Sequence, residues 1–336
     1  MRQLWTDDEL DQALAELHAD VRPTPNGLAT VRDRVLNPAA ARGPRFRSPW
    51  FPLAAAAAVA ALVTSVLVLL PHTVQPAAPP TATDLSSQQL SALLAKIHYS
   101  DPTVAPGQFK YVREQLWGGG SPDGLVDQAT TTWQPATWTD EWLRRTSIIG
   151  MVPATYANGA IKATGPEKQL NMTNQDVTAA CGDFDSVNPQ VTGHLPCVGQ
   201  KGGWLTPTPE WLAALPRDPE QLLDEELKAS QAAMSPLYMA IYALRSGVVP
   251  ADVRAALYRA LAGAPGSYGR ENVPNLQGKR GLAIGVIDRG IHDELLIDPS
   301  DGSFLGERQY SESTGTVIAY SALSYAVVDG KGVTPK

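Results

Sequence analysis

The sequence predicts an α+β fold: an antiparallel curved sheet with helices packed on one face, preceded by one transmembrane helix and a short helical cytoplasmic tail. Three observations predict it. An uncharged apolar run occupies residues 51–70. Segments rich in β-branched and aromatic residues lie near both ends of the remaining chain, and helical segments with proline start signals lie between them.

Length and composition limit the class of protein. The 336 residues allow about two domains. A charged fraction of 18% and only two cysteines exclude a disordered or disulfide-dense chain. The net charge of −7 argues against nucleic acid as a partner, because phosphate binders normally carry a basic surface.

Residues 1–48 predict a cytoplasmic tail with short amphipathic helices. Thr6 and Glu9 fit a capping box, and leucines then recur on one helical face. The layout resembles the cytoplasmic segment of membrane-bound anti-sigma factors, in which a short helical domain binds a sigma factor. An ordinary juxtamembrane tail is the alternative.

Residues 49–70 predict an uncleaved signal anchor, because twenty uncharged residues span about 30 Å, the thickness of a bilayer core. The long segment before the run argues against a cleaved signal peptide; a buried helix of a soluble protein is the other alternative. Arg42, Arg45 and Arg47 precede the run, and the next basic residue is Lys96. We therefore expect the lipid bilayer as a partner, a cytoplasmic N-terminus, and a C-terminal domain outside the plasma membrane.

Residues 71–83 hold four prolines and no charge, and predict a semi-rigid linker to an extracytoplasmic α+β domain at 84–336. A helix is expected over 84–99, where Ser86 and Gln89 fit a capping box. Alternation of β-branched and aromatic residues predicts strands at 108–117, 130–133 and 141–148.

A helical block follows, and Gly247 and Gly263 fall where C-terminal helix caps belong. Prolines mark four helix starts, at 208–209, 218–219, 235–236 and 250. The chain then returns to strands, with turns at 288–290 and 298–302. Those strands are expected at 282–287, 291–297, 304–310 and 316–328.

Two segments carry a family resemblance: RGLAIGVIDRGIHDELLIDPSDGSFLGERQY, residues 280–310, and the preceding VPADVRAALYRALAGAPG. They are similar to the C-terminal motif of a family of uncharacterised actinobacterial single-pass membrane proteins with an Arg-bearing tail and an Ala-rich anchor. The resemblance implies location and leaves the biochemical role open. The order of elements also resembles the half-barrels of lipoprotein carriers and of periplasmic regulators of anti-sigma factors, in which a curved sheet wraps helices around an apolar groove.

Cys181 and Cys197 are expected to form a disulfide, because the compartment outside the membrane permits oxidation. The bond would contribute roughly 3 kcal/mol in the chain-entropy model. Metal binding by both thiols with His194 is the alternative, although the spacing lacks the usual C-x₂-C pair. Asp183 and Asp185 are interpreted as solvated turn acids, and we expect no metal and no cofactor.

The sequence contains no hydrolase, zincin, phosphate-loop or dinucleotide motif, and we therefore predict that the protein is not an enzyme. His292 and Glu294 share one face of a strand and are interpreted as exposed. Residues 224–226, Asp-Glu-Glu, are interpreted as a solvated helix face.

Six tryptophans follow the linker, and three of them fall within ten residues. The simplest interpretation places them in the core of the sheet. The alternative is a groove, lined by Trp133, Trp138 and Trp142, that binds a lipid or a cell-wall fragment. Core rings should pack on aliphatic side chains, whereas groove rings should line a cavity.

The leading functional hypothesis is a single-pass membrane protein whose outer domain binds or senses a ligand in the envelope without enzymatic activity. The second is a membrane-tethered, anti-sigma-like regulator that holds a cytoplasmic regulatory protein through residues 1–48. The third is an envelope hydrolase with an unrecognised site, which requires a cleft with convergent polar groups and perturbed acids.

Overall fold

The computed structural model describes residues 82–121, 124–170, 172–184, 200–230 and 235–336. The chain divides into two units, Met1–Val74 and Gln75–Lys336, and every described residue belongs to the second unit. Several predicted features therefore lie outside the described residues: the tail at 1–48, the apolar run at 49–70, the flanking Arg42, Arg45 and Arg47, and nearly all of the linker.

The structure corrects the predicted fold class, and it gives no support to the predicted transmembrane helix, whose residues 49–70 lie outside the described part of the chain. The described residues form mostly antiparallel sheet, and the helical content is 19%. No helix among them is both long and apolar enough to cross a membrane. The longest of these helices has 13 residues, which at 1.5 Å per residue gives about 20 Å against a bilayer core of about 30 Å.

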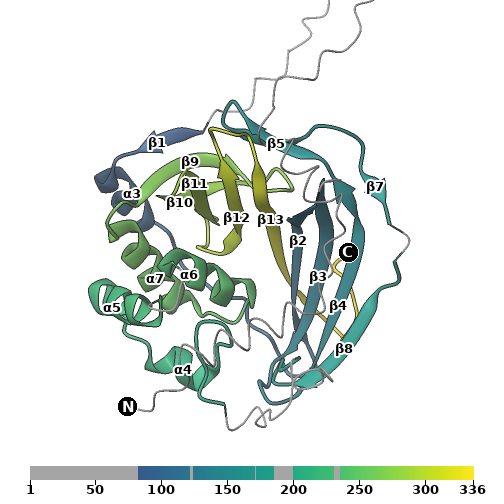
Figure 1. Ribbon diagram of the computed structural model, residues 1–336. Coiled ribbons are helices and arrows are strands. Elements are labelled where there is room, and N and C mark those ends of the chain that lie inside the picture. Colours follow the sequence, from purple (N-terminus) through teal and green to yellow (C-terminus); the bar gives the residue numbers. More distant parts are fainter. Residues whose placement is uncertain (1–81, 122–123, 171, 185–199, 231–234) are drawn as a thin grey trace, which may run out of the picture. The chain divides into compact units, whose positions relative to one another are not determined.

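One antiparallel sheet of 11 strands dominates the described part of the chain (Figure 1). Its order is β1-β9-β10-β11-β12-β13-β2-β3-β4-β7, and β8 also pairs with β4. Because β13 pairs with β2, the last strand joins two meanders into one sheet. The strands are β1 (Thr83–Leu85), β2 (Phe109–Ser121), β3 (Gly124–Pro135), β4 (Glu141–Val152), β7 (Lys168–Gln169), β8 (Gln175–Ala180), β9 (Tyr268–Pro274), β10 (Arg280–Asp288), β11 (Ile291–Ile297), β12 (Phe304–Ser311) and β13 (Val317–Val328).

The alternation of residues along each strand gives the sheet two faces. In β3, every second residue from Leu125 to Trp133 is buried, and the residues between them are half-buried. Gln134, which follows Trp133 and shares the face of the half-buried residues, is buried as well. The side chain of Gln134 donates to the Ser246 carbonyl at 2.6 Å, so the helices lie on its face. We call this the inner face, and the face of Trp133 the outer face.

Five helices occur among the described residues, and Figure 1 shows them grouped beside β9–β12. Helix α3 contacts β9, α6 contacts β11 and β12, and α7 contacts β10. The predicted start signals are confirmed: Ser86 and Gln89 form a capping box, and Thr208 and Ser235 cap helices with proline in the first turn. The helices are α3 (Ser87–Leu94), α4 (Pro209–Ala214), α5 (Pro219–Ser230), α6 (Pro236–Arg245) and α7 (Ala251–Gly263).

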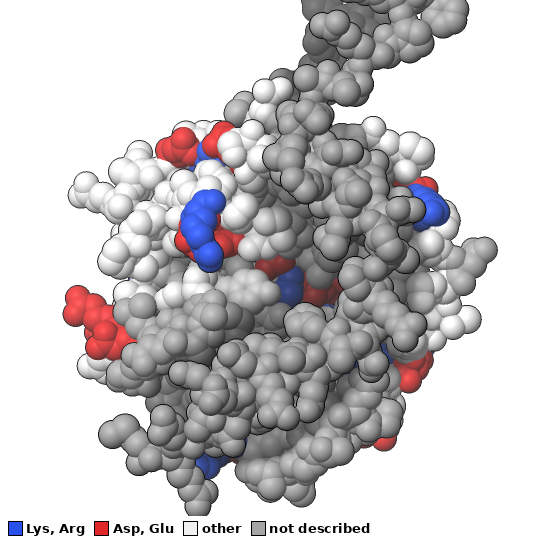
Figure 2. All heavy atoms as spheres, in the orientation of Figure 1, with Lys and Arg blue, Asp and Glu red and all other residues white. Residues whose placement is uncertain are grey.

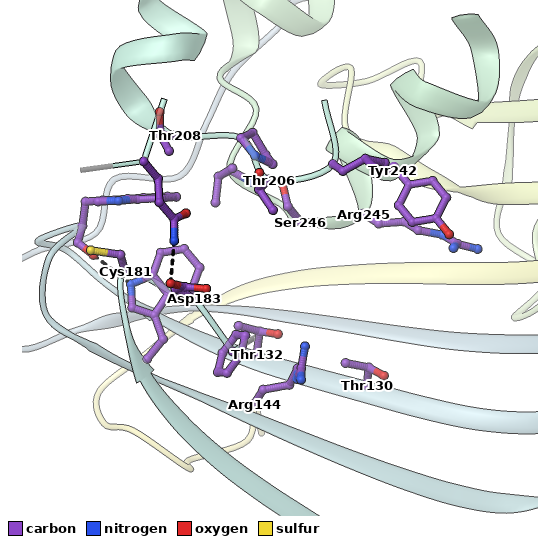
Figure 3. Close-up of a pocket in the computed structure, with 18 residues that line it drawn as sticks. Thr130, Thr132, Arg144, Cys181, Asp183, Thr206, Thr208, Tyr242, Arg245 and Ser246 are labelled. Atoms are coloured by element: carbon purple, nitrogen blue, oxygen red, sulfur yellow. Dashed lines mark hydrogen bonds between the residues drawn. The ribbon is translucent and has the colours of Figure 1, made fainter. Parts of the chain in front are cut away.

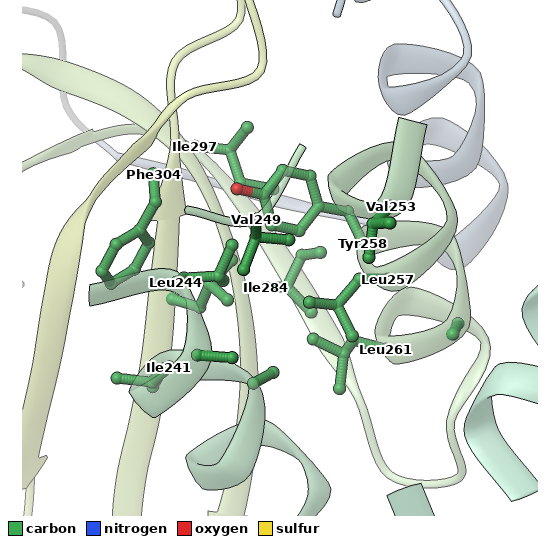
Figure 4. Close-up of a cluster of buried hydrophobic side chains, with 14 of the residues drawn as sticks. Ile241, Leu244, Val249, Val253, Leu257, Tyr258, Leu261, Ile284, Ile297 and Phe304 are labelled. Carbon is green, nitrogen blue, oxygen red and sulfur yellow. The ribbon is translucent and has the colours of Figure 1, made fainter. Parts of the chain in front are cut away.

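The main core lies between these helices and the inner face of β10–β12 (Figure 4). Leu244 of α6 and Leu257 of α7 meet Ile284, Ile297 and Phe304 of the sheet, and all five are at most 2% exposed. Each such side chain contributes roughly 1.5–3 kcal/mol through burial. Tertiary packing, more than helix propensity, therefore holds these short helices in place.

The outer face is covered by other parts of the chain. A hairpin of β5 (Ala154–Ala157) and β6 (Ala160–Ala163) places Tyr156 on Tyr310 of β12, with stacked rings 3.9 Å apart. Near the C-terminus, the Val333 carbonyl accepts a hydrogen bond from the indole of Trp133 at 2.5 Å. Both faces of this sheet are thus used for packing.

A buried ion network on the outer face corrects one prediction. Glu294 is fully buried, and it accepts hydrogen bonds from Tyr268 at 3.0 Å and Tyr310 at 3.1 Å. The Nε of Arg308 lies 3.3 Å from its other oxygen. His292 shares this face, as expected, and stacks on Tyr310. The prediction of an exposed face was wrong for Glu294, because the tyrosine rings and the guanidinium enclose its carboxylate.

Candidate binding groove

A cavity of about 340 Å³ lies between the inner face of β3 and β4 and helix α6 (Figure 3). We call this cavity the groove. Thr130, Thr132 and Arg144 face it from the strands, and Tyr242 and Arg245 face it from α6 on the opposite side. Its volume falls in the range of small-molecule sites, roughly 300–1,000 Å³. The remaining lining comes mainly from residues 181–184 and 205–208.

Aromatic rings form one part of the groove wall. Trp138 and Trp142 meet edge to face with ring centroids 4.9 Å apart, and the Trp142 indole donates to the Trp138 carbonyl at 3.1 Å. Gly182 passes close to this pair: a Cβ there would lie 2.5 Å from the Trp142 ring, and its φ is +68°. Both facts require glycine, which lets the backbone approach the ring.

Hydroxyl, amide and guanidinium groups form the other part. The Arg144 guanidinium lies over the Phe184 ring at 4.3 Å, and the Gln200 side chain donates to Asp183 at 2.6 Å. A guanidinium stacked in this way keeps its N–H groups at the edge of the plane, where they can bond an acceptor. The groove wall therefore combines aromatic rings with polar groups, and on β4 both kinds, Trp142 and Arg144, lie on one face.

Arg245, the last residue of α6, links the helix to two acidic side chains of the sheet behind the groove. Its Nε lies 3.0 Å from Glu114 Oε1 on β2, and its Nη2 bonds Glu307 on β12. The side chains of Arg245, Glu114 and Glu307 are 21%, 17% and 7% exposed. Two carboxylates and one guanidinium thus place an excess negative charge where water reaches poorly, which favours protonation of a carboxylate.

The acids of this cluster have shifted pKa values. Burial raises the pKa of Glu307 to about 7; Arg245 opposes the rise, while Glu114 and Asp293 add to it. Burial also raises the pKa of Glu114. On the helix, the hydrogen bond to Tyr242 raises the pKa of the Tyr238 hydroxyl to about 12. Glu307 is therefore a member of the cluster that can exchange a proton near neutral pH.

A second cavity of about 400 Å³ shares Trp138, Trp142 and Val248 with the groove. Lys110 lines it, and its ammonium donates to the Gly247 carbonyl at 2.6 Å. Burial lowers the pKa of Lys110. The two tryptophans therefore stand between two hollows, and a ligand longer than one cavity would pass them.

The three predicted groove tryptophans separate in the structure. Trp138 and Trp142 line both cavities. Trp133 lies on the outer face, is 1% exposed, and meets the edge of Tyr111 with centroids 5.6 Å apart. Successive strand residues point to opposite faces, so Trp133 packs away from Thr132 and the groove.

The other predicted site residues are only partly described. Cys181 lines the groove and is not a free thiol. The predicted Cys181–Cys197 disulfide is not seen between described residues, because Cys197 lies outside them. His194 and Asp185 lie outside them as well. Within the described ranges, no group of three His, Cys, Asp or Glu side chains could hold a metal ion.

The sequence does not reveal the Glu114–Arg245–Glu307 cluster, because its members lie far apart and match no local motif. One feature of the sequence could have indicated the cluster. Glu114 and Glu307 sit within strands at positions whose neighbours two residues away are Val112 and Leu305. A charge at a position that alternation assigns to an apolar face is a reason to search for a partner.

No protein-family model matches the chain, and no curated protein matches its sequence. The resemblance to the actinobacterial single-pass family, the cytoplasmic regulatory protein at residues 1–48 and the position of the domain outside the cell stay predictions. On the described part of the surface in Figure 2, acidic and basic side chains lie interspersed.

Proposed function

We propose that the protein binds or senses a saccharide-like ligand, such as a cell-wall fragment, in the groove. One observation carries the proposal: a single cavity is lined by the aromatic residues Trp138 and Tyr242 together with the polar residues Thr130, Thr132 and Arg144. A sugar ring has apolar C–H faces and hydroxyl edges. It therefore matches a wall that holds both aromatic rings and hydrogen-bonding groups.

The same lining argues for a saccharide rather than a lipid. An acyl chain gains only from apolar surface, and it would form no hydrogen bond with the polar side chains that line the groove. A ligand with hydroxyl groups satisfies them. A lipid is therefore an outcome of the test and not the proposal.

The experiment is a titration of the full chain with neutral and acidic di- to tetrasaccharides, followed by intrinsic tryptophan fluorescence, with lysophosphatidylcholine as the lipid arm. We expect saccharides to change the emission, and Trp138→Ala to weaken binding about fivefold, since a stacked aromatic contact contributes about 1 kcal/mol.

Trp211→Ala is the matched control. Trp211 is also half-buried and also meets another tryptophan, Trp204, edge to face at 4.9 Å, but it lines neither cavity. Equal losses in the two variants would contradict the proposal. So would binding of lysophosphatidylcholine alone.

A second candidate function is hydrolysis, and Glu307 is the observation that favours it. A carboxyl whose pKa is about 7 beside a second acid, Glu114, has the properties of a general acid. However, Arg245 stands between both acids and the groove. Release of reducing ends from an oligosaccharide, abolished by Glu307→Gln, would favour hydrolysis over binding alone.

A further inference from the structure

The cluster of Arg245, Glu114 and Glu307 indicates which saccharides the protein selects, an inference that rests on the proposed function. We propose that the groove binds an acidic saccharide whose carboxylate or phosphate group bonds the Arg245 guanidinium, and that the protonation of Glu307 behind it controls the affinity. The contacts of Arg245 carry this proposal.

The guanidinium stands nearer to the ligand than the carboxylates do. Arg245 and Tyr242 line the groove, whereas Glu114 and Glu307 are not among its lining residues. Both carboxylates bond Arg245 from the sheet. A ligand therefore meets N–H donors first, and a planar guanidinium matches the oxygens of a carboxylate or a phosphate.

Arg144 supplies a second cation across the groove. It comes from β4, and Figure 3 shows it below the cavity, with Arg245 and Tyr242 on the α6 side. Arg144 and Arg245 thus line the groove from different elements. Among the described residues that line it, Asp183 is acidic and accepts a hydrogen bond from Gln200.

The charge behind Arg245 determines whether an anion is attracted. When Glu114 and Glu307 are both ionised, the cluster carries a net charge of −1 and repels an anion. When Glu307 is protonated, the cluster is neutral and its donors are nearest to the ligand. Coulomb energies fall with distance, so the nearer guanidinium then outweighs the more distant carboxylate.

Other groups around Glu307 do not reverse this effect. Asp293, on the neighbouring β11, accepts from Gln309 at 2.6 Å and adds negative charge on the same side as Glu114. Tyr238, on α6, stays neutral because its pKa is about 12. With a pKa of about 7, Glu307 is thus the group to which we assign the change in charge between pH 6 and pH 8.

The size of the effect follows from linkage. With a pKa of about 7, Glu307 is about nine-tenths protonated at pH 6 and about one-tenth at pH 8. If the acidic ligand binds only the protonated form, its affinity falls about tenfold between these pH values. A neutral saccharide gains nothing from Arg245 as a cation and should show a much smaller change.

The test is calorimetric titration of the full chain with a trimer of galacturonic acid, with maltose 1-phosphate and with neutral maltotriose, each at pH 6 and pH 8. We expect the galacturonate trimer, which is ionised at both pH values, to bind about tenfold more weakly at pH 8. Tighter binding of the carboxylate or of the phosphate compound identifies the source of the acidic group. Equal binding of all three at both pH values overturns the inference but leaves the proposed function in place. If no saccharide binds, both fail.

Glu307→Gln separates the charge effect from folding, because the amide keeps a hydrogen-bond acceptor for Arg245. This variant should bind the galacturonate trimer at pH 8 as tightly as the unchanged protein does at pH 6. Glu271→Gln, a half-buried acid on β9 outside the groove, is the matched control and should keep the tenfold pH dependence. A pH dependence that persists in Glu307→Gln would overturn the assignment of the switch to this residue.

Discussion

Replacing Gly247 by alanine should destabilise the domain at the point where α6 meets the sheet. Gly247 follows the helix with a φ of +72°, and a Cβ there would lie 2.7 Å from a methyl group of Val112 on β2. The left-handed conformation costs an alanine about 1 kcal/mol, and overpacking against a buried side chain costs about 1–3 kcal/mol. The free energy of unfolding should therefore fall by about 2–4 kcal/mol.

The assay is urea unfolding of the full chain, followed by far-ultraviolet circular dichroism. Gly263→Ala is the control, because Gly263 is the last residue of α7 and an added Cβ meets no heavy atom within 4 Å. That substitution should stabilise the protein by up to about 1 kcal/mol, since alanine loses less backbone entropy in a helix. If Gly247→Ala changes stability by less than about 0.5 kcal/mol, the scale of an ordinary surface substitution, or if both changes have the same sign, the account of this junction is wrong.

Three further predictions concern stability. Glu307→Gln should remove a pH dependence of the free energy of unfolding. Because folding raises the pKa of Glu307 from 4.5 to about 7, its protonation contributes about 3 kcal/mol of stability below about pH 4.5, and this contribution is lost as the pH rises through 7. Urea titrations at pH 5 and pH 8 check this, and an unchanged pH dependence in the variant would contradict it. Glu294→Ala should cost about 3–5 kcal/mol, because it leaves Arg308 buried without its carboxylate; a thermal melt close to that of the unchanged protein would disagree. Ser86→Ala should cost about 0.5–2 kcal/mol through loss of the α3 cap, measured by the same melt.

Local signals predicted many elements well. The strand expected at 291–297 is β11, and the turn at 288–290 joins it to β10 in register. Serine and threonine caps located the starts of α3, α4 and α6. These features depend on a few neighbouring residues, and for that reason a sequence pattern can specify them.

Other elements were decided by long-range contacts. The strand predicted at 108–117 ends before the glycine-rich segment at 118–120, yet this segment continues β2, because β3 pairs with that strand beyond Leu116. The strands between Ala154 and Ala180 carry weak alternation and were not predicted; β8 is fixed by its pairing with β4. Pairing with a distant strand can override a local preference.

Part of the groove could likewise be predicted from local sequence, and part of it depends on long-range contacts. Two of its tryptophans could be suggested from the sequence because aromatic residues cluster there. The sequence does not predict on which face of the sheet each ring lies, because a shift of one residue in strand register would exchange the faces of Trp133 and Thr132. The ion cluster of Arg245 depends on three elements that meet only in the fold.

The most direct test of the groove as the ligand site is ¹⁹F NMR of the full chain labelled with 5-fluorotryptophan. The chain contains eight tryptophans, and Trp→Phe variants assign their signals. Addition of a bound saccharide should shift the signals of Trp138 and Trp142, and leave those of Trp133, Trp204 and Trp211 unchanged. Shifts confined to Trp204 and Trp211, or the absence of any shift at Trp138 and Trp142, would contradict the account.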